Sequence, residues 1–231
     1  LQSIERKQTL AANKEQQLQQ ALSADQAADE TGQLLFSTFM KAFAEQLPSD
    51  PIVFDEALTS SPAMTRYLPP RKEGHYFVTR GGSLGVGIPG AIGLKLANPD
   101  KTVVGFTGDG GSMYTIQALW TAARYNVDAK FVICNNRSYK LLQLNIKQFW
   151  EETSIPAHDF PLSFDLSRPA IRFDEMARSM GVEAIRIEKP EEIEAAIQQA
   201  LTHKGPFLLD VVIDGDINPD AIEEMCGSVG S

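Results

Sequence analysis

Apolar side chains recur every three to four positions in residues 32–47, which is the pattern of a helix with one buried face. The apolar positions of this series are Leu35, Phe36, Phe39, Met40 and Phe43. Pro48 follows the last of them and cannot continue a helix. The pattern therefore predicts a core-facing helix that ends before Pro48.

Downstream of this helix, short apolar runs alternate with stretches of helical periodicity. The runs predict strands at residues 52–55, 76–79, 103–107, 130–134, 184–187 and 207–213. The stretches between them predict helices at residues 60–67, 88–98, 112–125, 173–180 and 190–203. Most runs are continuously apolar, as in strands buried on both faces of a parallel sheet. We therefore predict an α/β fold, with a doubly wound, mainly parallel six-stranded sheet and helices on both faces.

Two segments depart from this alternation. Residues 1–30 are polar and rich in glutamine, and we expect a loose helix followed by a linker. Residues 145–170 contain prolines and polar turns, and we expect a long irregular loop, which is either ordered over an active site or disordered. Because the chain begins with Leu1, we expect a piece of a longer polypeptide. In this division, residues 1–31 are a polar helical connector from a preceding domain, and residues 32–231 form the main domain.

Charge and composition narrow the classes of partner. The formal net charge of −9 argues against a nucleic-acid-binding surface and against docking on anionic lipid. No apolar run reaches about 18 residues, so we expect no membrane span. Only two cysteines occur, without the spacing of disulfides or metal sites, and we expect a cytoplasmic protein. Cys134 lies in an apolar run, which predicts a small buried hydrophobic residue.

Polar residues after the strands are the first candidates for chemistry, because ligands of open parallel sheets lie beyond the carboxyl ends of the strands. Residues 103–136 have the size of one strand–helix–strand unit, with Asp109 after the first strand and Asn136 after the second. A right-handed crossover brings both residues to the same sheet edge. Their oxygens are ligands of the kind that Mg²⁺ prefers, and phosphate oxygens would complete its coordination shell.

The glycines beside Asp109 extend this interpretation to a diphosphate. Gly110 and Gly111 permit close backbone approach. The helix expected after them presents free N–H groups and the positive end of its dipole to an anion. In the alternative interpretation, Asp-Gly and Asn-Asn are turn-forming dipeptides that bind no ligand.

The pair Gly108-Asp109-Gly110 and Asn135-Asn136, at the two ends of this unit, resembles the signature of thiamine-diphosphate-dependent enzymes. Residues 81–93, 118–126 and 135–139 are most similar to benzoylformate decarboxylases and more distantly to acetolactate synthases. The resemblance covers about residues 50–215, which correspond to the C-terminal, diphosphate-binding domain of the family.

This resemblance implies thiamine diphosphate and Mg²⁺ as cofactors. It assigns Mg²⁺ to Asp109, Asn136 and the main-chain oxygen of Ser138. The implied cofactor-binding residues are Thr59, Ser60, Gly82, Ser83, Leu84, Gly108, Gly110, Gly111, Ser112 and Tyr139.

Individual roles follow from the same resemblance. Leu84 would be the apolar wedge that bends the cofactor, and the carbonyl of Gly82 would accept a hydrogen bond from its aminopyrimidine. Thr59 and Ser60 could donate hydroxyls to the diphosphate, although either could equally be a helix N-cap. An ordinary core position is the alternative for Leu84.

The sequence departs from the family pattern at three places. Gly111 stands where relatives often have serine, so a hydroxyl donor is lost or moved to Ser112. Arg137 replaces a glycine after Asn-Asn. Residues 140–150 differ from the substrate-facing residues of relatives, which leaves Leu142 and Asn145 as candidates for the substrate pocket and the substrate undefined.

The resemblance implies a 2-oxo-acid decarboxylase, with an acetolactate-synthase-like carboligase as the alternative. We expect no activity from this chain alone, and no catalytic residue is assigned in it. The glutamate that activates the pyrimidine would come from a missing pyrimidine-binding domain or subunit, in a homo-oligomer, either a dimer or a tetramer. We expect surface or capping roles for Glu56, and the histidines, His75, His158 and His203, are not expected to be the acid–base residues.

Two alternatives of another class remain. Residues 85–90 read Gly-x-Gly-x-x-Gly between a predicted strand and a predicted helix, with Asp109 at the end of the next strand, as in a dinucleotide-binding module. A structural or assembly domain is the other alternative. NAD binding would not need Mg²⁺, and this distinguishes the dinucleotide hypothesis from a thiamine-diphosphate site.

Overall fold

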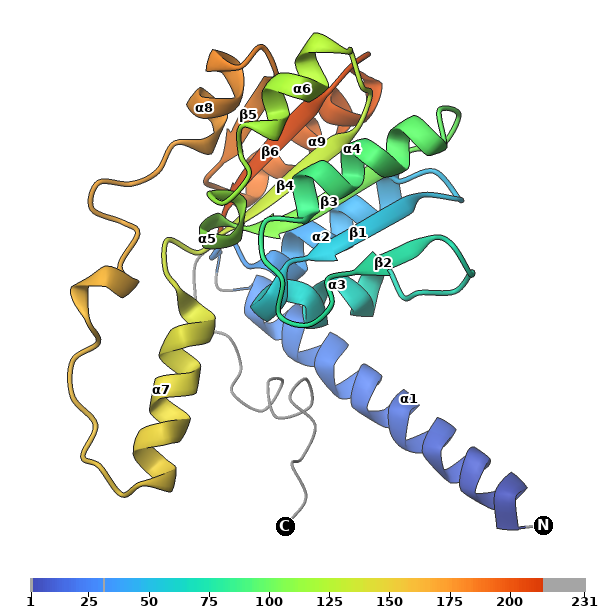
Figure 1. The fold of residues 1–231 in the computed structure, drawn as a ribbon. Coiled ribbons are helices and arrows are strands. Elements are labelled where there is room, and N and C mark those ends of the chain that lie inside the picture. Colours follow the sequence, from blue (N-terminus) through green and yellow to red (C-terminus); the bar gives the residue numbers. More distant parts are fainter. Residues whose placement is uncertain (1, 31, 214–231) are drawn as a thin grey trace.

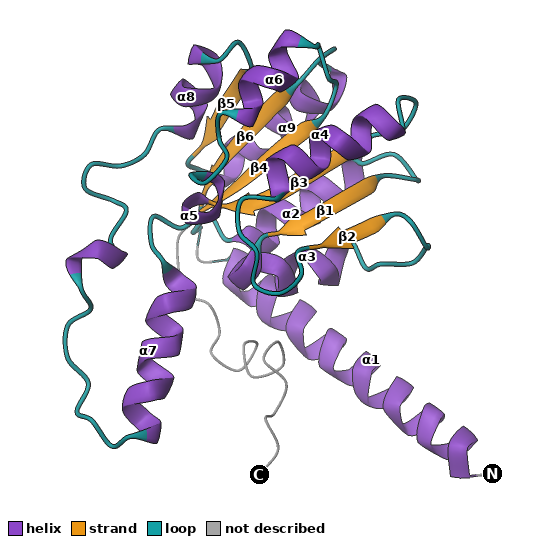
Figure 2. Cartoon of the chain, in the orientation of Figure 1, coloured by secondary structure: helices purple, strands orange, loops and turns teal. Residues whose placement is uncertain are grey.

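The computed structural model describes residues 2–30 and 32–213, with side chains from residue 5 onward. The end of the expected main domain, residues 214–231, lies outside this part. A single six-stranded parallel sheet with the order β2-β1-β3-β4-β6-β5 is at its centre (Figures 1 and 2). Its strands are β1 (Ile52–Glu56), β2 (Tyr76–Val78), β3 (Val103–Gly108), β4 (Lys130–Asn135), β5 (Glu183–Ile187) and β6 (Phe207–Val212). The predicted α/β class and the six-stranded parallel sheet are confirmed.

Helices cover both faces of this sheet. The helices are α1 (Gln2–Asp29), α2 (Phe36–Gln46), α3 (Ser61–Tyr67), α4 (Gly87–Ala97), α5 (Asp109–Ser112), α6 (Ala118–Arg124), α7 (Lys140–Glu152), α8 (Phe173–Ser179) and α9 (Ile193–Thr202). Three short 3₁₀ turns are η1 (Leu58–Ser60), η2 (Leu162–Phe164) and η3 (Pro190–Glu192). One face packs against α2, α3 and α9, and the other against α4, α6 and α8.

The central strands are buried on both faces because their side chains alternate between two apolar clusters. On β4, Val132 and Cys134 point to the side of α2 and α9, while Phe131 and Ile133 point to the side of α4 and α6. All four are at most 1% exposed, which explains the continuous apolar run in the sequence. Cys134 is a buried hydrophobic residue, as predicted.

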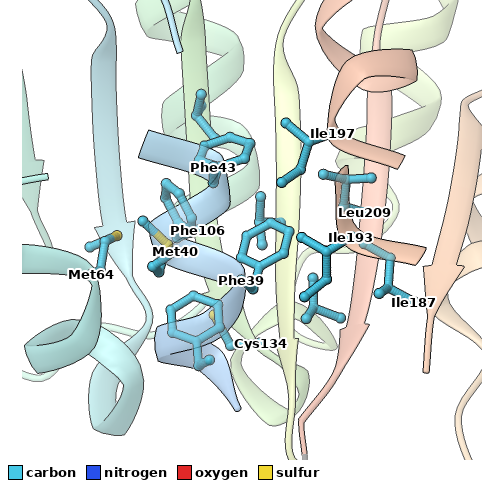
Figure 3. Close-up of a cluster of buried hydrophobic side chains, with 14 of the residues drawn as sticks. Phe39, Met40, Phe43, Met64, Phe106, Cys134, Ile187, Ile193, Ile197 and Leu209 are labelled. Atoms are coloured by element: carbon cyan, nitrogen blue, oxygen red, sulfur yellow. The ribbon is translucent and has the colours of Figure 1, made fainter. Parts of the chain in front are cut away.

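Aromatic residues of α2 form the centre of the apolar cluster between the sheet and helices α2, α3 and α9 (Figure 3). The ring of Phe43 meets that of Phe106 on β3 edge to face, with centroids 5.7 Å apart. Phe39 stacks on Phe43 at 5.3 Å. The series of apolar positions that predicts α2 therefore faces the sheet, and such aromatic pairs add specific geometry to the burial of apolar area.

The strand order determines where a ligand can bind. The chain passes from β1 outward to β2 and then returns to the other side of β1 to form β3. A crevice opens outside the carboxyl ends of strands at such a reversal. Glu56 ends β1, and Asp109 follows β3, so these carboxylates border the expected position of a ligand.

The predicted helix at residues 112–125 is divided in the structure into α5 and α6. Between them, the Thr115 hydroxyl donates to the carbonyl of Gly85 at 2.6 Å, and a Cβ at Gly85 would lie 2.7 Å from that of Tyr114. The contact of Tyr114 and Thr115 with Gly85 thus accompanies the interruption of the helix between α5 and α6.

The prediction of an irregular loop over residues 145–170 is wrong for its first part, which lies in α7. Trp150 on α7 is buried because the returning chain covers it, with the ring of Phe160 stacked at 5.6 Å. The helix packs against its own return segment, which follows it in sequence, and this contact is not visible in a local pattern.

The N-terminal segment forms one long helix, α1, which extends away from the sheet (Figure 1). Its C-terminal end is fixed by Asp25, which accepts two hydrogen bonds from Arg66 at 2.9 Å and one from the Tyr67 hydroxyl at 3.0 Å. Residues 5–17 are exposed. No helix within the described residues is long and apolar enough to cross a membrane.

Candidate functional site

The two polar ends of the β3–α5–α6–β4 unit meet at one backbone amide. The N–H of Ser138 donates to Oδ2 of Asp109 at 3.2 Å and to Oδ1 of Asn136 at 3.0 Å. The register of β3 and β4 pairs Gly108 with Cys134, which places the following residues side by side. We call residues 136–138 the cation loop. Side-chain oxygens from the two ends of the unit are therefore brought to one backbone donor.

Asp109 is buried with little compensation for its charge. It is 3% exposed, and its other oxygen accepts the N–H of Gly110 at 2.8 Å. Burial raises the pKa of Asp109 to about 6, against the lowering effect of the backbone hydrogen bonds, and the nearby Asp210 raises it further. No basic side chain in the part of the chain that the structure describes forms an ion pair with Asp109.

These residues fit a divalent cation. The hydroxyl oxygen of Ser138 is buried and has no hydrogen-bond partner, although buried hydroxyls rarely remain unpaired. Within residues 2–30 and 32–213, no group of three His, Cys, Asp or Glu side chains could hold a metal by itself. The oxygens of Asp109, Asn136 and Ser138 therefore suit an ion such as Mg²⁺ only when ligand or water oxygens add to them.

The cation loop turns sharply at Arg137. Its φ of 58° lies in the left-handed region, which favours glycine. The arginine there costs about 1–2 kcal/mol of backbone strain. This conformation turns the amide of Ser138 back toward Asp109.

The glycines around Asp109 serve different purposes. A Cβ at Gly110 would lie 2.5 Å from Cε1 of Tyr139, so Gly110 makes room for that ring. At Gly82 and Gly108, a Cβ would meet no atom of the described residues within 4 Å, so these residues do not fill the adjacent space. At Gly111, a Cβ would touch Glu56 and Thr107 at an ordinary 3.4 Å.

The hydroxyl candidates lie near the same sheet edge. Ser112 is buried, and its hydroxyl donates to the carbonyl of Asp109 at 2.8 Å. Thr59 and Ser60 are buried in the turn after β1. Ser60 lies against the thiol of Cys134, so its hydroxyl has a structural partner.

The candidates in the turn after β2 and on α7 are exposed. Leu84 is 40% exposed in the turn after β2, and its alternative as a core residue is therefore excluded. Ser83 lies in the same exposed turn, and its N–H donates to the carbonyl of Arg80 at 3.2 Å. Leu142 and Asn145 are both exposed on α7.

Glu56 has a role that the sequence does not reveal. It is 1% exposed, so the expectation of a surface position is wrong, while the capping role is correct. Its two carboxylate oxygens accept the N–H groups of Gly85 and Gly87 at the start of α4. Burial raises the pKa of Glu56, and these hydrogen bonds lower it.

This contact argues against the dinucleotide hypothesis. The N–H groups of Gly85 and Gly87 would have to bind the pyrophosphate. They already donate to a protein carboxylate. The glycines instead allow close packing, since a Cβ at Gly90 would lie 2.7 Å from the ring of Phe54 on β1.

The histidines have contacts of their own. Nδ1 of His75 lies 3.0 Å from Asp50, the ring of His158 lies tilted against that of Trp150 at 4.3 Å, and the ring of His203 meets Phe207 at 5.3 Å. None of these contacts involves Asp109 or the cation loop.

Comparison with known protein families identifies the domain. The family model for "Thiamine pyrophosphate enzyme, C-terminal TPP binding domain" matches residues 59–211. The chain belongs to this family. The matched range contains every residue that the sequence implicated in cofactor or metal binding.

Relatives of this thiamine pyrophosphate (TPP) domain agree with the match. A benzoylformate decarboxylase from Pseudomonas aeruginosa is 35% identical over 184 residues, covering 80% of this chain and 33% of that protein. The acetolactate synthase isozyme 1 large subunit of Escherichia coli is 33% identical over 135 residues, covering 58% of this chain and 23% of that protein.

A solved structure agrees as well. The thiamine diphosphate-dependent 4-hydroxybenzoylformate decarboxylase of Rhodococcus jostii RHA1 superposes with a TM-score of 0.70 at 29% identity, covering 81% of this chain and 34% of that one. The TPP domain described here spans about a third of the length of these decarboxylases.

Proposed function

We propose that this chain is the diphosphate- and Mg²⁺-binding domain of a thiamine-diphosphate-dependent 2-oxo-acid decarboxylase of the benzoylformate decarboxylase type. The observation that carries the proposal is the convergence of Asp109 and Asn136 on the amide of Ser138, at the strand ends where the sheet reverses direction. The family match supports thiamine diphosphate as the ligand.

Each residue of the site would contribute to holding the cofactor. Asp109, Asn136 and Ser138 would coordinate Mg²⁺, and the positive charge of the ion would screen the negative charge of the diphosphate. The open space beside Gly82 and Gly108 would receive the ligand. When bound, thiamine diphosphate supplies a thiazolium carbon that adds to 2-oxo acids and accepts the electrons released with carbon dioxide.

The exposed candidates would shape the rest of the site. Leu84, which is 40% exposed in the turn after β2, would pack against the bent cofactor. Leu142 and Asn145 on α7 would line the substrate pocket. Burial of apolar ligand surface against such residues excludes water from the reacting atoms.

The isolated chain would bind the cofactor and turn over no substrate. The carboxylate that activates the pyrimidine would come from a pyrimidine-binding domain elsewhere in the protein or in a partner subunit, within a homo-oligomer. Of the carboxylates at this edge, Glu56 is already engaged by two backbone amides, and Asp109 faces the cation loop.

Calorimetric titration of the 231-residue chain with thiamine diphosphate tests the binding function. We expect binding with Mg²⁺ and at least tenfold weaker binding with EDTA. Asp109→Asn should abolish the Mg²⁺ dependence, whereas Asp100→Asn, at an exposed position before β3, should preserve it. Tight binding of NAD without Mg²⁺ would contradict the proposal.

Product analysis separates the two activities. The full-length protein, given a 2-oxo acid, should release carbon dioxide and the aldehyde that is one carbon shorter. A 2-hydroxy-2-alkyl-3-oxo acid as the main product would establish the carboligase alternative. Turnover by the 231-residue chain alone at the rate of the full-length protein would refute the requirement for a second domain.

A further inference from the structure

A buried ion pair, Asp210 with Arg186, lies behind the cation loop. We propose that Asp210 on β6 and Arg186 on β5 are positioning residues that hold the cation loop in its metal-binding shape. The inference rests on the proposed function for the identity of the ligand.

A continuous chain of hydrogen bonds connects this pair to the loop. Arg186 donates from a guanidinium nitrogen to Oδ2 of Asp210 at 2.6 Å. The other oxygen of Asp210 accepts from Nδ2 of Asn135 at 2.8 Å. The Oδ1 of Asn135 in turn accepts the N–H of Arg137 at 3.3 Å. The chain therefore ends inside the cation loop, between Asn136 and Ser138.

The direction of each bond is determined by chemistry. An ionised Asp210 can only accept hydrogen bonds, so Asn135 must turn its NH₂ group toward it. The carbonyl oxygen of Asn135 is then left facing the N–H of Arg137. The charge of Asp210 thereby selects one of the two orientations of the Asn135 amide.

Burial makes this selection strict. Asp210 is fully buried and Asn135 is 2% exposed. If the Asn135 amide were reversed, its NH₂ group would face the N–H of Arg137, and burial would leave these two donors facing each other without an acceptor. Arg186, whose side chain is 8% exposed, compensates the charge of Asp210 and also pairs with Glu188 at 2.7 Å.

The position of Arg137 explains why the loop needs such support. Its φ of 58° is strained for an arginine, and the bond from its N–H to Asn135 opposes relaxation. Release of that bond would let the amide of Ser138 turn away from Asp109. Groups that orient metal ligands from behind change metal affinity by about 10–100-fold when removed.

The test compares three variants of the 231-residue chain. In Asp210→Asn, the new asparagine must turn its side-chain oxygen toward the donor Arg186. Its NH₂ group then faces Asn135, and the Asn135 amide must reverse to accept from it. In Asp210→Asn combined with Arg186→Met, this requirement is gone, and the new amide can present its oxygen to Asn135 again. Lys130→Met is the control. Lys130 is a buried cation at the start of β4, the strand that ends with Asn135, and it pairs with Asp128 at 2.6 Å.

Two measurements are made on each variant. The first is amide hydrogen exchange at Arg137 and Ser138 in the metal-free chain. The second is the dissociation constant of Mn²⁺ in the presence of thiamine diphosphate. For Asp210→Asn we expect at least tenfold faster exchange at these amides and at least tenfold weaker Mn²⁺ binding. The double variant should return both values to within about threefold of the wild type, although it is the more altered protein.

The outcomes are distinguishable. Unchanged exchange in Asp210→Asn, no recovery in the double variant, or an equal effect of Lys130→Met would overturn the positioning role. If the wild type binds no Mn²⁺ with thiamine diphosphate while the exchange pattern is as expected, the proposed function fails and the positioning of the loop stands.

Discussion

At the scale of single residues, the protonation of Asp109 depends strongly on its surroundings. The fold buries its carboxylate beside backbone amides, and burial raises its pKa from 3.8 to about 6. Because the native pKa exceeds the unfolded one, the native state binds the proton more tightly. Stability from this group is therefore present at low pH and is lost as the pH rises from about 4 through 6.

Asp109→Asn should therefore stabilise the metal-free chain at pH 7.5, by about 1–3 kcal/mol. The gain should disappear below pH 4, where the wild-type carboxyl is protonated. Urea unfolding over pH 3.5–7.5 measures both effects. With Mg²⁺ and thiamine diphosphate the order should reverse, because only the wild type gains binding energy. A variant less stable than the wild type at neutral pH without metal would contradict this account.

Two adjacent glycines should respond differently to a side chain. Gly110→Ala places a Cβ against the ring of Tyr139 and should cost about 1–3 kcal/mol of unfolding free energy. Gly111→Ser places its Cβ at ordinary contact distance and should change stability by less than about 0.5 kcal/mol. Thermal unfolding of the two variants side by side decides the matter, and equal destabilisation would show that Tyr139 does not pack as described.

At the scale of elements, α7 and its return segment form a unit attached at the cation loop. The N–H of Tyr139 donates to the carbonyl of Phe164 at 3.0 Å, and the N–H of Leu166 to that of Arg137 at 2.9 Å. Both ends of the excursion are thus fixed beside the site. Between them, its packing depends on Trp150.

Trp150→Ala should release this unit without unfolding the sheet. The loss of a buried indole weakens local packing by a few kcal/mol, so the segment opens more often while the core remains intact. Limited proteolysis should cleave residues 153–161 at least about tenfold faster than in the wild type, since about 1.4 kcal/mol corresponds to a factor of ten. The neighbouring Phe149→Ala, at a position 54% exposed, should have little effect.

Helix α1 should contribute to stability only at its C-terminal end. Removal of residues 1–16 should leave the Tm within about 2 °C, because residues 5–16 expose their side chains. Asp25→Asn weakens the bonds to Arg66 and Tyr67 and should lower the Tm by roughly 3–6 °C. Calorimetry of both variants tests this, and a large effect of the truncation would indicate packing that involves the first turns.

The spacing of apolar residues predicted most elements, because each strand and each helix buries side chains at the spacing typical of its kind. The six strands and α2 follow directly from such spacing. The sequence did not predict α7, whose apolar face is covered by a segment that follows it, nor the division at Thr115, which results from contact with Gly85. Both depend on contacts between segments, and a local pattern contains no information about them.

At the scale of the molecule, the same limit applies to the site. Asp109 and Asn136 could be paired from the sequence because one strand–helix–strand unit connects them. Asn135 and Asp210 could not, because β4 and β6 are brought together only by the complete sheet order. The role of Glu56 was hidden for the same reason, since its partners follow a different strand.

The two bonds that Glu56 accepts have a consequence for the direction in which a ligand can lie. Among the described helices, α4 after β2 and α5 after β3 have glycines at their starts, on either side of β1, and each start would attract a phosphate on its own. The carboxylate of Glu56 already accepts the N–H groups at the start of α4. At the start of α5, a Cβ at Gly108 would meet no atom of the described residues within 4 Å. A diphosphate that binds this domain would therefore lie at the start of α5 and not at the start of α4, and this difference would fix its direction in the site.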